Sequence, residues 1–301
     1  ATTANVAPFI TKAAEEWFRG PLEKGLASAG YSSDWYHTTS ADLADRRVAM
    51  GGPDAGIGRN TDGLRNAVSL LVASRGAGIG RTDLRRRVQA QVLAVSSILA
   101  SAARRAGDLV KLRQFVERDI ASRACQGETV IVAAPTPSEY GLRLLDPETG
   151  AVKRVTVAWE SSLQLRPLKT RTRPCGYWLA ASEVEAAARL QALGIVVQQF
   201  EEGGELRGQT YRESGEIALP VATPGTDTGM AVGLRVETQP TLLDVPAGSY
   251  YVSLEQPLAN LVIAALEPEA PGSYPAERIV PSLDAMARVL ARPTMRLMDA
   301  R

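Results

Sequence analysis

The sequence predicts an α/β region followed by a β-rich α+β region. Residues 67–72 are continuously apolar apart from one serine and are bounded by polar turn residues, which is typical of an interior strand of an α/β sheet. Two long segments with apolar residues at helical spacing follow this run. From Glu128 onward the sequence changes to short segments of alternating apolar and polar residues, the pattern of β-strands.

Composition limits the class of protein and its partners. The chain has 301 residues, 45% of them hydrophobic, enough to bury a core without metal or disulfide staples. No apolar run approaches the roughly 20 residues that cross a bilayer, so we expect a soluble protein with no membrane partner. Lys and Arg number 34 against 33 Asp and Glu, a net charge of +1. Because so weak a field cannot hold a polyanion, we expect no nucleic-acid partner.

The beginning of the chain is expected to combine helices with a long irregular excursion. Residues 8–29 predict two short helices separated at Gly20 and Pro21, because glycine ends a helix and proline begins one. Residues 34–62 are rich in Gly, Asp, Thr and Ser and predict irregular structure with one short strand around Val48. Long ordered loops of this kind usually carry function.

Two helices are expected after the apolar run. Thr82 or Asp83 can cap a crossover helix that stops at Gly107. Its inward-facing residues would be Leu84, Val88, Val92, Val95 and Leu99. Asp108 can cap a second helix, which runs to about Ala124 and bridges two domains. Its inward-facing residues would be Leu109, Leu112, Phe115, Val116 and Ile120.

The β-rich region is expected to be a domain with its own core. We expect a hairpin loop at 146–150 and a helix after Ser182 and Glu185, whose spacing forms a capping box. A further apolar helix is expected from Pro257 to Leu266. The predicted strands are 129–133, 140–145, 152–159, 163–168, 177–179, 195–200, 209–219, 231–238 and 249–254. The predicted division is residues 1–107, a linking helix at 108–127, and a β-rich accessory domain at 128–301, with 127–301 able to fold alone.

Histidine and cysteine are scarce. With His37 as the single histidine and no His-x-x-Glu or Cys-x-x-Cys pair, a zinc site built wholly from this chain would be unusual. Cys125 and Cys175 allow one disulfide, but buried free thiols are equally consistent with the sequence. The sequence begins with Ala1 and no apolar segment follows, so we expect no signal peptide and a mature, trimmed or partial chain.

Other motifs are weak. Gly76, Gly78 and Gly80 precede a helix as a phosphate-binding loop would, but their spacing fits neither a P-loop nor a dinucleotide fingerprint, and a plain tight turn explains them. A free-standing nucleotide or sugar enzyme, or a serine hydrolase centred on His37, lacks a self-contained site. His37 is either a hydrogen-bonded structural residue or a substrate contact. Arg59, Arg65 and Arg75 could bind a carboxylate in bidentate fashion or be salt-bridged at the surface.

One stretch carries a family resemblance. It comprises Gly51-Gly52, Gly58-Arg59-Asn60, and Gly63 through the apolar run to Ala73-Ser74-Arg75-Gly76. This stretch resembles the end of the catalytic domain of zinc metallocarboxypeptidases, the carboxypeptidase A-like group, and in particular bacterial members with an extra C-terminal domain. Residues 245–269 and 176–179 resemble the end of those proteins too. The resemblance implies that the α/β region is the end of a carboxypeptidase-like α/β/α sheet domain.

The resemblance also implies a site in which this chain supplies the substrate side. In the family a central strand ends in Glu-x-Arg, and that glutamate is the general base. Here Ala73 stands in its place and Arg75 would be a structural brace. The substrate-binding candidates are Tyr36, His37, Arg59, Asn60 and Arg65. The zinc ligands would lie in an N-terminal part outside this sequence, as a partner fragment or a missing portion.

The function that follows is zinc-dependent hydrolysis of C-terminal peptide or amide bonds, with this chain alone inactive and binding no zinc. Because a methyl group cannot take a proton from water, Ala73 indicates either a deliberate replacement that traps substrate or a non-catalytic peptide-binding or assembly module descended from a carboxypeptidase. The expected partners are a peptide or amino-acid conjugate and the N-terminal part of the same protein. A periplasmic or secreted location is favoured over a cytoplasmic one.

Overall fold

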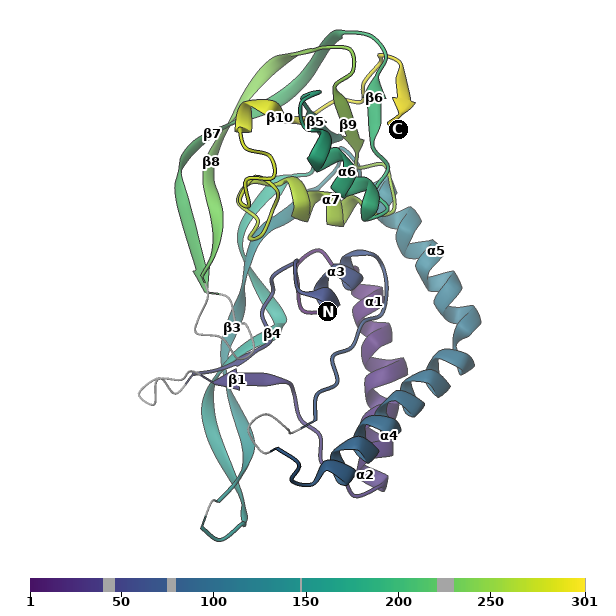
Figure 1. The fold of residues 1–301 in the computed structure, drawn as a ribbon, viewed down its shortest axis with the longest axis vertical. Helices are drawn as coiled ribbons and strands as arrows, with labels where there is room; N and C mark the ends of the chain where they lie inside the picture. Colours follow the sequence, from purple (N-terminus) through teal and green to yellow (C-terminus); the bar gives the residue numbers. More distant parts are fainter. Residues whose placement is uncertain (40–46, 75–79, 147, 221–229, 301) are drawn as a thin grey trace.

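The computed structural model describes residues 1–39, 47–74, 80–146, 148–220 and 230–300. Its helices lie mostly in the first part of the chain, and its strands mostly in the second (Figure 1). The helices are α1 (Pro8–Ala13), the π-helical η1 (Ala14–Arg19), α2 (Gly20–Ser28), α3 (Gly58–Leu64), α4 (Leu84–Arg104), α5 (Ala106–Ser122), α6 (Val184–Ala192), α7 (Ala259–Leu266) and the 3₁₀ turn η2 (Leu283–Ala285). The expected mixed α/β composition with a β-rich second part is confirmed.

The strands of the described residues form two sheets. The first has four strands in the order β1-β2-β4-β3, and the second has seven in the order β11-β6-β9-β5-β10-β7-β8. The strands are β1 (His37–Thr39), β2 (Arg47–Met50), β3 (Glu128–Leu145), β4 (Val152–Thr172), β5 (Gly176–Leu179), β6 (Gln198–Phe200), β7 (Gly204–Pro220), β8 (Met230–Val245), β9 (Tyr250–Ser253), β10 (Met286–Val289) and β11 (Leu297–Asp299). Among these strands only β2 and β4 pair in parallel.

The N-terminal helices form one continuous run instead of two separate helices. Pro21 has no N–H, so an α-helix through it would leave one carbonyl without its usual donor. The π-helical stretch η1 accommodates this: the Gly20 N–H donates to the Glu15 carbonyl, five residues back. Glycine and proline therefore mark a change of helix geometry here and not a helix boundary.

Two long strands replace four expected short ones. β3 and β4 form a hairpin that runs along much of the long axis of the molecule (Figure 1). The ladder is irregular where proline removes N–H donors: Thr136 pairs with Ser161, but the next partner pair is Ala134 with Arg166. Residues 162–165 therefore bulge out of the ladder. This bulge explains why the sequence predicts two separate strands where the structure has the single strand β4.

Residues 67–72 are not the interior strand that the sequence predicts. They belong to no strand, and Leu71 is 48% exposed. A strand of a parallel sheet needs neighbours for its backbone groups, and the described residues offer none here. The inward face expected for α4 is also wrong, because its five residues Leu84, Val88, Val92, Val95 and Leu99 are all exposed. In α5, Val116 and Ile120 are buried as expected, but Phe115 is 47% exposed.

The main core is shared between the two predicted domains. It joins Ile10 and Leu64 from the first part and Ile120 from the predicted linking helix with Tyr177 and Leu266 from the second part. The strand pair β2–β4 also crosses the predicted boundary. Whether residues 127–301 fold alone stays a prediction.

A buried ionic cluster lies at the centre of the seven-stranded sheet. Glu267, fully buried after α7, accepts hydrogen bonds from Tyr177 Oη at 2.7 Å and Arg288 Nε at 3.0 Å. Arg288 also donates to Gln209 Oε1 at 2.6 Å and to the Thr172 carbonyl, so it ties strands β10, β7 and β4 together. Each of the two charges, on Glu267 and on Arg288, compensates the other, and this offsets the desolvation penalty of burying them.

The remaining local predictions have mixed outcomes. Cys125 and Cys175 form a disulfide with 4.2 Å between their Cα atoms, which resolves the open alternative. The predicted capping box is wrong, because Ser182 Oγ donates to the neighbouring Glu183 carboxylate and caps no helix N–H. Asp83 occupies the N-cap position of α4, but its side chain makes no capping hydrogen bond. No helix among the described residues has both the length and the apolar character to cross a bilayer.

Candidate functional site

Asn60 organises the loop that follows β2. It is fully buried in α3, and its Nδ2 donates to the Gly52 carbonyl at 3.1 Å and the Asp54 carbonyl at 2.8 Å. Its Oδ1 accepts from Thr2, from the backbone N–H at 2.7 Å and from Oγ1 at 3.2 Å. Both N–H donors of the amide and two acceptor positions are thus occupied within the chain. Asn60 therefore holds the glycine turn and the N-terminal segment together.

Arg59 lies beside the same turn. Its Nη2 donates to the Gly52 carbonyl at 3.3 Å and to Thr2 Oγ1 at 3.4 Å. A Cβ at Gly51 would lie 2.3 Å from this guanidinium nitrogen, so only glycine permits the approach. Burial lowers the pKa of Arg59, and the nearby Tyr36 opposes that shift. The structure therefore places two of the sequence-predicted candidates, Arg59 and Asn60, on the same glycine turn and on Thr2. Tyr36 makes no contact with this turn that the described structure records.

The other predicted residues do not join this group. His37 Nδ1 lies 2.8 Å from the Trp35 carbonyl, and its ring centroid lies 5.8 Å from that of Trp159, so its contacts are those of a structural residue. Arg65 is exposed at the end of α3, and Ala73 is exposed in the irregular segment after it. Arg75 lies outside the described residues. The roles given to these residues stay predictions.

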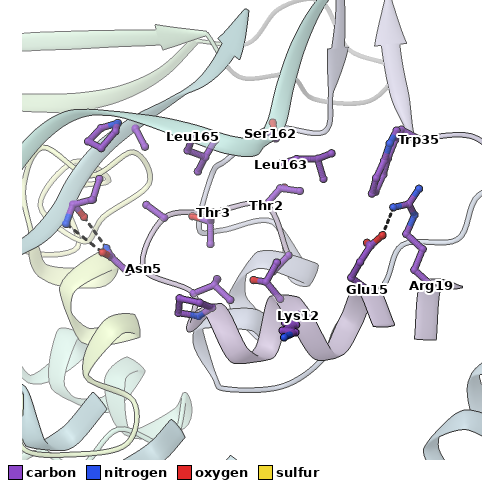
Figure 2. A pocket seen from close by; sticks show the side chains of 18 of the residues that line it. Thr2, Thr3, Asn5, Lys12, Glu15, Arg19, Trp35, Ser162, Leu163 and Leu165 are labelled. Atoms are coloured by element: carbon purple, nitrogen blue, oxygen red, sulfur yellow. Dashed lines mark hydrogen bonds and ion pairs between the residues drawn. The ribbon is translucent and has the colours of Figure 1, made fainter. Parts of the chain in front are cut away.

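A cavity of about 680 Å³ opens next to the Asn60 group, between the N-terminal segment, the first helices and the β3–β4 hairpin (Figure 2). It is lined by residues 1–6, then by Pro8, Thr11, Lys12, Glu15, Glu16, Arg19, Trp35, Val130, Ala133, Ser162, Leu163, Leu165 and Pro167. The β4 bulge thus supplies one wall and the helices the opposite one. Its volume and its mostly apolar surface with a few polar groups are those of a ligand-binding cavity.

Two groups of side-chain contacts fix the walls of the cavity at opposite ends (Figure 2). At one end Arg19 stacks 3.5 Å above the centre of the Trp35 ring, and its guanidinium is paired with Glu15 at 2.5 Å (Figure 2). At the other end Asn5 clasps strand β3, donating to the Val130 carbonyl at 2.7 Å and accepting from the Val130 N–H at 3.2 Å. These contacts fix the positions of the two walls.

Ser162 is the polar group of the cavity whose hydrogen-bonding capacity is unused. Its Oγ is buried and has no partner among the described residues. Because this atom is closed off from solvent, it is an unsatisfied buried hydroxyl at the β4 bulge, and it is not exposed to a ligand in this structure. Sequence reasoning missed it, although Pro135, Pro137 and Pro167 signal an interrupted ladder at this point.

A second, more polar cavity of about 310 Å³ shares Arg19 with the first. Its basic residues Arg143 and Arg154 are direct cross-strand neighbours on β3 and β4. Tyr140 Oη donates to Asp34 at 2.5 Å, and this hydrogen bond raises the pKa of the tyrosine. The charges of the lining are mixed, so this cavity is a weaker candidate than the first.

The described residues do not fit a zinc centre on their own. No group of three or more His, Cys, Asp or Glu side chains in this part of the chain is close enough to hold a metal ion. Both cysteines are bonded to each other, and the lone histidine has the contacts given above. A catalytic zinc needs three protein ligands, which would have to come from elsewhere.

Comparison with known proteins supports a relationship to carboxypeptidases. The chain is 25% identical over 289 residues to a protein named carboxypeptidase 2 from Trichophyton rubrum, a match that covers 93% of this chain and 52% of that protein. It is 26% identical over 292 residues to carboxypeptidase 2 of Trichophyton tonsurans, with the same coverage, and 25% identical over 275 residues to a probable carboxypeptidase 2 of Arthroderma benhamiae. The chain spans about half the length of these relatives. It matches no protein-family profile and no solved structure.

Proposed function

We propose that this chain is part of a zinc-dependent carboxypeptidase-like hydrolase that cleaves C-terminal peptide or amide bonds, with the metal ligands outside this sequence. The observation that carries the proposal is the similarity to proteins named carboxypeptidase over 93% of the chain. The absence of a metal-holding group among the described residues is consistent with ligands on another portion. On this proposal the chain contributes substrate contacts and no zinc ligand.

The substrate contacts belong to the surface around the glycine turn and the adjoining cavity. Arg59 lies behind the cavity's N-terminal wall, because its Nη2 donates to Thr2, which lines the cavity, and Lys12 and Arg19 are cations of the lining itself. A guanidinium is the group best suited to the carboxylate of a peptide terminus. Leu163 and Leu165 offer apolar contacts for the preceding side chains. The substrate is thus a peptide or an amino-acid conjugate.

A second function, a non-catalytic peptide-binding or assembly module, is favoured by one observation. The position that the family resemblance assigns to the general base is Ala73, whose methyl group cannot exchange a proton with water. On this alternative the cavity binds peptide and no turnover follows.

The two functions are separated by substituting Ala73 in the full polypeptide. Ala73 is exposed in the described structure, so a longer polar side chain there buries no unpaired charge in this chain. We expect Ala73→Glu, assayed with zinc, to release C-terminal amino acids from peptides at least about 10²-fold faster than the unsubstituted protein. The matched control is Ala73→Gln, which has the same shape but no basic carboxylate.

Three measurements decide the outcome: zinc content, peptide binding and release of amino acids. Equal activity of the glutamate and glutamine variants, with zinc bound and the fold intact, would exclude the general-base assignment. A full polypeptide that binds peptide but no zinc would establish the binding module instead.

A further inference from the structure

Helix α4 buries two small residues, Ala94 and Ser101, and exposes most of its large aliphatic ones. At roughly 100° per residue, Leu84, Val88, Val92, Val95 and Leu99 fall within about 80° of one another on the helix. We call these five residues the α4 ridge. Each is between 46% and 63% exposed. The face that α4 buries against α2 is built around Ala94, which is 1% exposed. This arrangement is the reverse of a helix whose packing is complete.

An unpaired strand-like segment lies beside this ridge. No backbone N–H of residues 68–74 donates to a backbone carbonyl of the described residues. Val72 and Ile98 of α4 both pack against the cluster of Leu22, Leu26 and Ala94, and the Val72 carbonyl accepts a hydrogen bond from Gln91 Nε2 at 3.5 Å. Gln91 and Ile98 both flank the ridge on one side of the helix. The Ser69 carbonyl accepts from the Ala1 amine at 3.4 Å, and apart from that of Val72 no other backbone carbonyl of residues 68–74 accepts a hydrogen bond from the described residues. The segment, whose backbone N–H groups pair with no backbone carbonyl of the described residues, therefore lies next to the apolar ridge.

This surface has the properties of an interface with a β-sheet. The segment offers N–H and C=O groups for strand pairing, and β-branched and leucine side chains that suit a strand. The ridge offers an aliphatic stripe of the kind that packs on a sheet face in α/β proteins. Five exposed large aliphatic side chains in a single stripe also exceed the scattered exposure that is normal for a surface.

We propose that the α4 ridge and residues 67–74 together bind the portion of the same polypeptide that lies outside this sequence, which supplies strands on both sides of the segment. Two observations favour this occupant. The chain spans about half the length of its relatives, so a portion of comparable length has a place in such a protein. The partner must also present both an open sheet edge and an apolar sheet face. The remaining part of a domain that is shared between two portions of one polypeptide has both features. The identity of the partner rests on the proposed function, whereas the surface does not.

The test uses two separately tagged chains, this one and the remaining portion of the gene product, and measures their affinity by titration calorimetry. Val92→Asp combined with Leu99→Asp places two charges on the ridge. The matched control is Gln89→Asp combined with Ala100→Asp, which adds the same charges at exposed positions on another side of α4. We expect the ridge pair to weaken binding by about 30-fold or more and the control pair by less than about 3-fold. Circular dichroism checks that both variants fold.

Hydrogen exchange gives an independent readout of the same surface. We expect the amides of residues 67–74 to exchange rapidly in this chain alone and slowly in the complex, because strand pairing protects them. Equal affinities of the ridge and control variants, or unchanged exchange at 67–74, would overturn the proposal. The proposal would also be overturned if this chain forms a dimer that is lost in the Val92→Asp and Leu99→Asp variant and that persists when the other portion is added. The surface would then bind a second copy of this chain. Ridge-dependent binding without zinc or hydrolysis would refute the proposed function and leave the surface standing.

Discussion

Replacing Asn60 with alanine tests whether this residue is a structural or a substrate-binding group. The side chain makes three hydrogen bonds that do not compete: Nδ2 donates to the carbonyls of Gly52 and Asp54, and Oδ1 accepts from the Thr2 N–H. The single proton of the Thr2 hydroxyl serves either Oδ1 or the Gly52 carbonyl. A net contribution of about 1 kcal/mol for each of the three gives about 3 kcal/mol. The Gly52 carbonyl keeps the Thr2 hydroxyl and Arg59 as donors in the variant, so we expect a loss of about 2–3 kcal/mol in the free energy of unfolding.

The assay is urea unfolding followed by tryptophan fluorescence, with peptide affinity measured on the same samples. Arg65→Ala is the matched control, because Arg65 lies at the end of the same helix and is exposed; its effect should stay within about 0.5 kcal/mol. Unchanged stability of Asn60→Ala together with weaker peptide binding would refute the structural role that we assign to Asn60.

Three further predictions concern the scaffold. Arg288→Met should lower the free energy of unfolding by about 3–5 kcal/mol because it leaves Glu267 charged and unpaired, and adding Glu267→Gln should recover part of that loss in the same urea assay. Replacing both half-cystines by serine should cost up to about 4 kcal/mol, since the bond closes a loop with a sequence separation of 50; calorimetry without reductant checks this. Lys153 and the turn N–H groups lower the pKa of Asp146 to about 2. The stabilisation from this carboxylate is therefore fully present above its ordinary pKa of 3.8 and is lost as the pH falls through about 2. Lys153→Ala should raise the pKa of Asp146, which an NMR titration measures.

Local patterns predicted the elements whose own composition and flanking turns mark them. The strand at β5, the helix α6 and the apolar helix α7 were all predicted in this way, although β5 pairs with the distant strands β9 and β10. β10 was missed, because its four residues include Arg288, which no pattern marks as a buried strand residue. That arginine is buried only because Glu267 meets it from a distant segment.

Residues 67–74 and α4 show the opposite case. Their sequences have the periodicity of an interior strand and a crossover helix, yet neither finds what such elements pack against among the described residues. Periodicity reports which face of an element avoids water, but it does not report whether the covering partner is present. The failure at these two elements therefore carries information about the interface.

The candidate site was predicted in part. The glycine turn with Arg59 and Asn60 was identified from the sequence, and the structure joins these two residues through Thr2. Ser162 and Asn5 were not identified, because the first depends on a bulge and the second on a clasp across more than a hundred residues. Contacts between residues so far apart in the sequence produce no periodic pattern from which they could be predicted.

The parallel pairing of β2 with β4 has a consequence for the order in which the chain acquires its structure. Arg47 of β2 aligns with Ala158 of β4, so during translation this ladder can form only after most of the β3–β4 hairpin has been synthesised. During that interval β2 can pair only with β1, as a short and marginal ribbon. A nascent chain arrested before β4 would therefore expose Val48 and Met50 to chaperones, although both are buried in the finished protein.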